Sequence, residues 1–99
     1  MAKLLKGDTK KYLEDVPGDC VFRCQDGSVF RNMRELRDGL AIMSEETYLF
    51  HANADKNDFS TWVIDVITDQ KLALDLQKAT SADDATRRVG TRFAGLRRK

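Results

Sequence analysis

The chain has 99 residues, of which 41% are hydrophobic and 33% charged, and its formal net charge at pH 7 is +1. This length allows one domain with a modest core, and the composition excludes wholesale disorder. The small net charge gives the whole molecule no general attraction to nucleic acid or to anionic membranes. No apolar segment approaches the length of a signal sequence or a transmembrane helix, so we expect a soluble, cytoplasmic protein with no membrane partner.

The first 19 residues are mostly polar and end at Pro17 and Gly18. A short helical turn over residues 9–16 would place three apolar side chains on one side: Tyr12, Leu13 and Val16. We predict that residues 1–19 form a flexible lead, partly docked on the core, with residues 1–6 disordered. Residues 20–97 are predicted to form a single helical domain, and residues 98–99 a basic tail.

Residues 20–31 predict a β-hairpin, because two alternating segments flank the Asp-Gly turn at 26–27. A two-residue turn would pair Phe22 with Arg31. A three-residue loop with the glycine at positive φ pairs Phe22 with Phe30, and we prefer this register because it gathers the apolar side chains on one face. That face consists of Cys20, Phe22, Cys24 and Phe30.

Two helices are predicted after the hairpin. Asn32, followed by Glu35, is typical of a capped start for a helix over residues 33–43. Gly39 within it indicates either the close approach of a neighbouring element or a weak point. Ser44 is predicted to cap a second helix that continues over residues 48–53, although the aromatic residues Tyr48 and Phe50 also permit extended chain.

Three further helical segments follow a polar link at residues 54–57. Asp58 is predicted as the N-cap of the first, whose apolar stripe includes Trp62 as a core anchor rather than a stacking platform. Truncation of Trp62 should cost about 3–5 kcal/mol, and Asp58→Ala about 0.5–2 kcal/mol. The stripe is Phe59, Trp62, Val63, Val66 and Ile67. A break at residues 68–69 precedes the second segment, and Ser81 is predicted to cap the third.

Together these segments predict a mainly α fold: a small bundle of four to five short helices with one N-terminal β-hairpin. The inward-facing apolar residues of the last two helices are Leu72, Ala73, Leu76 and Ala79, then Ala85, Val89, Phe93 and Leu96.

Residues 12–78 also carry a set of short motifs. They are Phe22 with Asp26-Gly27, Leu36 with Gly39-Leu40, His51-x-Asn53, Lys56-Asn-Asp-Phe-x-x-Trp62, Asp65-Val-Ile67 and Leu72-Ala73. In these the chain resembles a small prokaryotic domain family of unknown function. It departs from the family's pattern in its cysteines and its basic tail. The resemblance implies the fold and names no substrate.

Four polar residues form the candidate site: His51, Asn53, Asn57 and Asp58. His51 could act as a general base or metal ligand, oriented by Asp55 or Asp58. Alternatively, it is a helix-end histidine bonded to the backbone or to the Asn57-Asp58 cap. No nucleophile or polarising group accompanies it, so no catalytic residue is predicted.

A metal site is the alternative use of the two cysteines. Cys20, Cys24 and His51 would need a fourth ligand from Asp26 or Asp58, and Cys-x-x-x-Cys on a strand is poor zinc spacing. In extended chain the two cysteine Cα atoms would lie about 13 Å apart, beyond disulfide reach. We therefore predict free cysteines in a reducing compartment, no metal and no cofactor.

The basic charge is concentrated after Asp84, where no acidic residue follows. These side chains could bind phosphates or form a solvated helix face. They are Arg87, Arg88, Arg92, Arg97, Arg98 and Lys99.

The leading hypothesis is a non-enzymatic protein-interaction or accessory module that presents residues 51–58 to a protein partner. One alternative is a nucleic-acid-binding protein that uses the last helix. Another is a small enzyme or metal-binding protein that uses His51.

Overall fold

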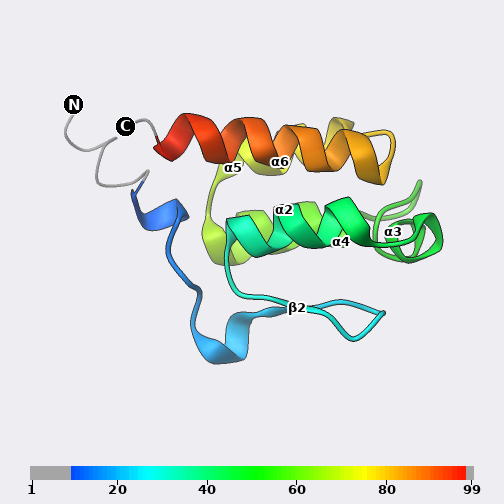
Figure 1. Ribbon diagram of the computed structural model, residues 1–99, viewed down its shortest axis with the longest axis horizontal. Helices are drawn as coiled ribbons and strands as arrows, with labels where there is room; N and C mark the ends of the chain where they lie inside the picture. The colour runs from blue at the N-terminus through cyan, green and yellow to red at the C-terminus, as the bar shows by residue number, and fades with distance from the viewer. Residues whose placement is uncertain (1–9, 98–99) are drawn as a thin grey trace.

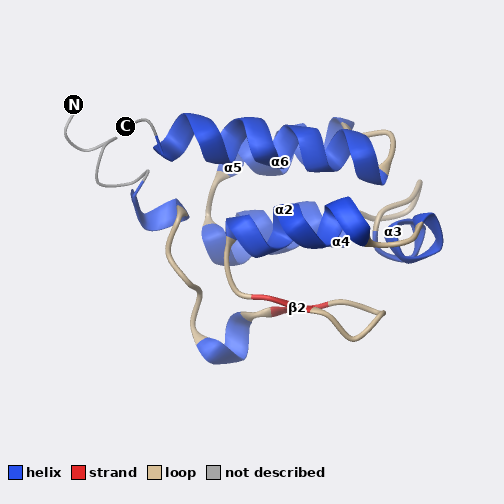
Figure 2. Cartoon of the chain, viewed as in Figure 1, coloured by secondary structure: helices blue, strands red, loops and turns tan. Residues whose placement is uncertain are grey.

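The computed structural model describes residues 10–97. After a 3-10 turn (Gly18–Cys20), the elements are β1 (Phe22–Arg23), β2 (Val29–Phe30), α2 (Met33–Ile42), α3 (Glu45–His51), α4 (Asp58–Trp62), a π-helical turn η2 (Val63–Ile67), α5 (Gln70–Lys78) and α6 (Ala82–Arg97). Within residues 10–97 helices dominate, and the two-stranded hairpin precedes the helices α2 to α6 (Figure 2). The predicted mainly α fold with one N-terminal β-hairpin is confirmed.

The helices pack in pairs around one core (Figure 1). α6 lies along α2, α5 contacts both α4 and α6, and β2 contacts α2. α3 stands at one end of the bundle, near the start of α6. The fully buried large apolar side chains come from four helices and from η2: Met33, Leu36, Leu40, Phe59, Val63, Leu72, Leu76 and Val89.

The hairpin has the register predicted from its apolar face. Phe22 pairs with Phe30, and Gly27 has a φ of 95°, which favours glycine. The strands are shorter than predicted, because pairing covers two residues on each side. The prediction that Cys20 lies on the strand is wrong: it ends the 3-10 turn and is only partly buried.

Side-chain caps begin the helices at most of the predicted places. Asn32 Oδ1 accepts from Glu35 N–H at 2.8 Å, and Ser44 Oγ accepts from Thr47 N–H at 3.0 Å. Ser81 Oγ accepts from the backbone N–H at position 84, also at 3.0 Å. Each bond satisfies an amide that the first helical turn leaves unpaired.

The predicted stripe after residue 58 is built differently from an ideal α-helix. α4 continues into η2, and Thr68 N–H donates to Val63 O at 2.7 Å, a bond spanning five residues. Thr68 then adopts a left-handed φ of 70° and ends the helix. This turn buries Val63 and Ile67 and leaves Ile64 38% exposed.

The lead docks on the core where it is described. Residues 10–12 are helical, and Val16 N–H donates to Arg31 O at 2.8 Å. Tyr12 and Leu13 pack against the core beside it. The predicted disordered segment 1–6 and the basic tail 98–99 lie outside the described residues. Within residues 10–97, no helix has both the length and the apolar character required to cross a bilayer.

Gly39 lies where α2 approaches the hairpin, so the predicted close approach is confirmed. A Cβ atom at this position would lie 2.3 Å from both Cε1 and Cζ of Phe30, whose ring is buried. We expect Gly39→Ala to lower the free energy of unfolding by about 1–3 kcal/mol, because overpacking outweighs the gain in helix propensity. Urea unfolding followed by circular dichroism measures this.

A second helical glycine provides the matched control for that substitution. A Cβ atom at Gly95 in α6 would meet no atom within 4 Å. Gly95→Ala should therefore raise the free energy of unfolding by about 0.5–1 kcal/mol. Equal stabilisation by both substitutions would contradict the proposed clash at Gly39.

Candidate functional site

His51 ends α3 and is buried among aromatic rings. Its ring centroid lies 5.1 Å from that of Phe22, 5.3 Å from that of Phe59 and 4.9 Å from that of Phe50. The residue is only 5% exposed. A buried imidazole needs partners for both ring nitrogens, since an unpaired polar atom in such surroundings is costly.

Both nitrogens of His51 have partners. The backbone N–H of Gln25, in the hairpin loop, donates to Nε2 at 3.0 Å. Nδ1 lies 2.9 Å from Oδ2 of Asp58. Because a backbone N–H can only donate, Nε2 must accept, and the ring proton lies on Nδ1 and is donated to Asp58.

This arrangement limits what His51 can do. Asp58, rather than Asp55, orients the ring through Nδ1, as a carboxylate does in a catalytic triad. At Nε2, however, the backbone amide of Gln25 occupies the position that a nucleophile would need. Nε2 can neither take a proton from a substrate nor bind a metal unless the bond to Gln25 opens. The residue therefore ties the hairpin loop to the start of α4.

The tautomer is a testable consequence. We expect ¹⁵N NMR of the neutral imidazole to show the proton on Nδ1, because the Gln25 amide requires an acceptor at Nε2. A long-range ¹H–¹⁵N correlation spectrum distinguishes the two forms. A proton on Nε2 would contradict this network.

The predicted cap at Asp58 is wrong by one residue. Asn57 is the N-cap of α4: its Oδ1 accepts from Ser60 N–H at 3.0 Å, and its Nδ2 donates to Leu76 O at 3.0 Å. Asn57 has the extended backbone of a cap, whereas Asp58 is already helical and binds His51 instead.

Asp58 is held in its ionised form. Partial burial of its carboxyl opposes ionisation, but hydrogen bonds from His51 and Lys56, together with the charge of Lys56, hold its pKa below the ordinary value. The Lys56 Nζ atom lies 3.1 Å from Asp58 Oδ2.

The lowered pKa predicts how stability depends on pH. A carboxyl whose pKa falls on folding stabilises the protein above its unfolded pKa of about 4, and this contribution is lost as pH falls through the folded pKa. Asp58→Asn should therefore reduce the loss of stability on acidification below about pH 4. Urea unfolding at a series of acidic pH values measures this, with Asp65→Asn as the exposed control; an unchanged pH profile in Asp58→Asn would contradict it.

Asn53 closes the connection between α3 and α4. Its Oδ1 accepts from Asp55 N–H at 2.9 Å, and its Nδ2 donates to Leu49 O at 2.8 Å. Its own N–H donates to Lys56 O at 2.8 Å, beside a bridge between Ala52 and residue 57. The four predicted residues therefore form two sets: His51 and Asp58, which bond to each other, and Asn53 and Asn57, whose side chains each bond to backbone groups.

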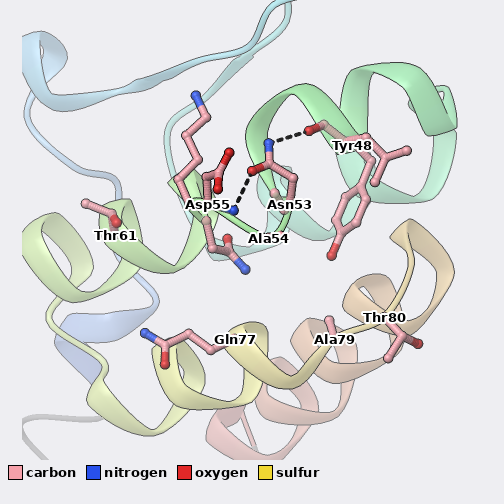
Figure 3. Close-up of a pocket in the computed structure, with 12 residues that line it drawn as sticks. Tyr48, Asn53, Ala54, Asp55, Thr61, Gln77, Ala79 and Thr80 are labelled. Atoms are coloured by element: carbon pink, nitrogen blue, oxygen red, sulfur yellow. Dashed lines mark hydrogen bonds between the residues drawn. The ribbon is translucent and has the colours of Figure 1, made fainter.

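A cleft of about 430 Å³ opens beside the second set (Figure 3). The α3–α4 connection forms one wall and the end of α5 with the α5–α6 connection forms the other. The lining residues are Tyr48, Leu49, Ala52, Asn53, Ala54, Asp55, Lys56, Asn57, Thr61, Gln77, Ala79 and Thr80. Asn53 and Asn57 thus line an open cleft, and His51 and Asp58 do not.

Several cleft residues were not predicted from the sequence. Tyr48, Thr61, Gln77 and Thr80 were not singled out as site residues, because no local pattern shows that residues 48–61 and 77–80 meet across a cleft. The short separation of α4 and α5 along the chain would have indicated only that these two helices are neighbours.

Both cysteines are free thiols. Burial is the main cause that raises the pKa of Cys24, and it also raises the pKa of Cys20, with a further increase from Asp19. Both thiols are therefore protonated at neutral pH and are weak nucleophiles and weak metal ligands. Within residues 10–97, no three His, Cys, Asp or Glu side chains are close enough together to hold a metal ion.

The arginines of α6 have partners within the protein. Arg87 and Arg88 both bind Asp84, the latter at 3.2 Å, and Arg92 forms a two-point ion pair with Asp69 at 2.8 and 3.0 Å. The Arg97 guanidinium lies 5.6 Å from the centre of the Phe93 ring. Arg98 and Lys99 lie outside the described residues.

A second hollow, of about 340 Å³, lies between α5 and α6. It brings Lys71, which was not predicted from the sequence, together with three of the predicted arginines. The residues that line it are Lys71, Asp75, Arg87, Arg88, Thr91, Arg92 and Gly95.

Comparison of the chain with protein-family models, curated proteins and solved structures finds no match. The resemblance to a small prokaryotic domain family therefore stays a prediction.

Proposed function

We propose that this protein is a cytoplasmic, non-enzymatic interaction module of a prokaryotic cell, and that it binds a partner protein through the end of the bundle formed by α3 and the α3–α4 connection. We call this surface the α3 end: Leu49, Phe50 and residues 53–56. The observation that carries the proposal is the exposure of two large apolar side chains at consecutive positions of α3. Leu49 is 48% exposed and Phe50 is 49% exposed.

The chemistry of the α3 end supports binding to a protein. Apolar side chains bordered by polar groups are typical of interaction surfaces, with aromatic residues as frequent anchors. The ammonium group of Lys56 lies 5.0 Å from the centre of the Phe50 ring, so a charged group already borders the apolar surface.

The rigidity of the connection also supports the proposal. Asn53 holds both ends of the turn, and the cap at Asn57 ties the turn to α5 through Leu76 O. A surface that is already ordered loses little conformational entropy when a partner binds.

Photo-crosslinking in the source cell tests the proposal. A photoreactive phenylalanine analogue placed at Phe50 should form a discrete adduct with another protein, and Leu49→Ser should diminish that adduct. The same analogue at Leu74, which is 52% exposed on α5, is the matched control and should give no discrete adduct. Adducts of equal yield at both positions, or none at Phe50, would overturn the proposal, and an adduct of twice the chain mass would show self-association instead.

Nucleic-acid binding is the second candidate, and the grouping of Lys71 with Arg87, Arg88 and Arg92 favours it. Against it, Asp69, Asp75 and Asp84 pair with these cations and offset most of their charge. Binding would show a strong salt dependence and would be lost when the α6 arginines are neutralised together. A gel shift at about 50 mM salt tests this, and the absence of a shift would remove the candidate.

A further inference from the structure

The hydroxyl group of Tyr48 is the unusual feature of the cleft. Tyr48 is only 4% exposed, and its ring stacks on Phe59 with centroids 5.7 Å apart. No residue in the described part of the chain hydrogen-bonds to the hydroxyl. Within residues 10–97, every fully buried side-chain nitrogen or oxygen has a partner, so the Tyr48 oxygen is not fully buried, and Tyr48 is one of the residues that line the cleft. Figure 3 shows it pointing across the cleft toward the α5–α6 connection.

The Tyr48 side chain is largely buried, but its oxygen is open to the cleft. Water or a ligand in the cleft can therefore supply the hydrogen bond that the protein does not. Between residues 10 and 97, every other buried polar side chain is paired internally, including His51, Ser60 and Asp69. The Tyr48 hydroxyl is therefore the group that a ligand in the cleft would satisfy.

The charges around the cleft indicate which ligand group it prefers. The two charged lining residues are Asp55 and Lys56, and the Lys56 ammonium is paired with Asp58. Asp55 forms no ion pair with any residue between 10 and 97. Burial, with a smaller effect of the Asp84 charge, raises the pKa of Tyr48, so its hydroxyl is neutral.

Helix ends do not reverse this preference. Two helix C-termini, those of α3 and α5, border the cleft, and so do two N-termini, those of α4 and α6. Their partial charges oppose each other, so the side-chain charges decide. The neutral lining side chains of Thr61 and Gln77 can accept as well as donate hydrogen bonds.

We infer that the cleft binds a cationic hydrogen-bond donor, namely the ammonium or guanidinium group of a lysine or arginine side chain on the docked partner. The inference rests on the proposed function, because the partner supplies that side chain. The Tyr48 hydroxyl accepts a hydrogen bond from the cation, and Asp55 supplies the opposite charge. A free small amine offers the same chemistry and is distinguished by the test.

NMR titration of the ¹⁵N-labelled protein tests the inference without the partner. The probes are N-acetyl-arginine amide, N-acetyl-lysine amide and, as a neutral isostere, N-acetyl-citrulline amide, each up to about 10 mM. We expect the two cationic probes to shift the amides of residues 52–57 and 77–80. Equal shifts with the citrulline probe, or no shifts with any probe, would overturn the inference.

Matched variants test the two residues. Tyr48→Phe and Asp55→Asn should each weaken binding of the arginine probe about five-fold or more, the loss expected for one hydrogen bond or ion pair. Tyr12→Phe and Asp65→Asn change the same chemical groups outside the cleft and should leave binding unchanged. Because the Tyr48 hydroxyl has no partner within residues 10–97, we expect Tyr48→Phe to fold with undiminished stability. Equal binding in all four variants would overturn the assignment.

Failure of the cation site can be distinguished from failure of the proposed partner docking. Crosslinking at Phe50 with no probe binding supports docking and overturns the cation site. Probe binding without crosslinking overturns the partner as the source of the cation.

Discussion

Replacing Asp69 with alanine should lower the free energy of unfolding by about 3–5 kcal/mol, because the change leaves a partly buried charge without its partner. The Asp69 side chain is 1% exposed and that of Arg92 is 21% exposed. Asp69 Oδ1 also accepts from Leu72 N–H at 3.2 Å and caps α5. For a small domain with a total stability of about 5–15 kcal/mol, this loss is large.

Urea unfolding followed by circular dichroism measures the effect. Asp65→Ala is the matched control: it removes an exposed aspartate four positions earlier and should change stability by less than about 0.5 kcal/mol. Asp69→Ala combined with Arg92→Met should recover part of the loss, because no unpaired charge remains. A loss of under about 1 kcal/mol in Asp69→Ala would show that the pair is not effectively buried.

Trp62→Ala should lower the free energy of unfolding by about 3–5 kcal/mol, because it removes the largest side chain of the core. Trp62 is 8% exposed, and its ring meets Phe22 edge to face at 5.8 Å. Its Nε1–H donates to Cys20 O at 2.8 Å, which ties the segment before the hairpin to α4. The predicted role as a core anchor fits this environment.

The experiment separates the ring from its hydrogen bond. Trp62→Phe keeps an aromatic ring but loses the bond to Cys20 O, and it should be less destabilising than Trp62→Ala. Circular dichroism must report unfolding, because Trp62 is the only tryptophan. Ile64→Ala, at a 38% exposed position, should change stability by less than about 0.5 kcal/mol. An equally small change in Trp62→Ala would refute the anchor.

Features set by neighbouring residues were predictable from the sequence. The Asn32 and Ser44 caps depend on an oxygen three positions before an amide, and the hairpin register on a glycine and two phenylalanines. Each of these contacts joins residues a few positions apart, so the local pattern of residue types is enough to predict it.

Features set by distant residues were not predictable. Asn57 and Asp58 are both suitable N-cap residues, and the sequence alone does not choose between them. The choice depends on His51, which hydrogen-bonds to the Asp58 carboxylate. His51 is in turn oriented by a backbone amide 26 residues away. The cleft likewise depends on how two connections meet. The arginines could be placed on one helix, but the partner of Arg92 lies 23 residues earlier, at Asp69.

The π-helical turn of η2 has a consequence for how related chains would compare with this one. Such a turn contains one residue more than an α-helical turn. A relative with one residue fewer in the segment Val63–Ile67 would close it as a regular α-helix and still place Phe59 and Leu72 in the core. Two chains with the same fold would then differ by a single-residue deletion inside a helix, where alignments ordinarily allow no gap.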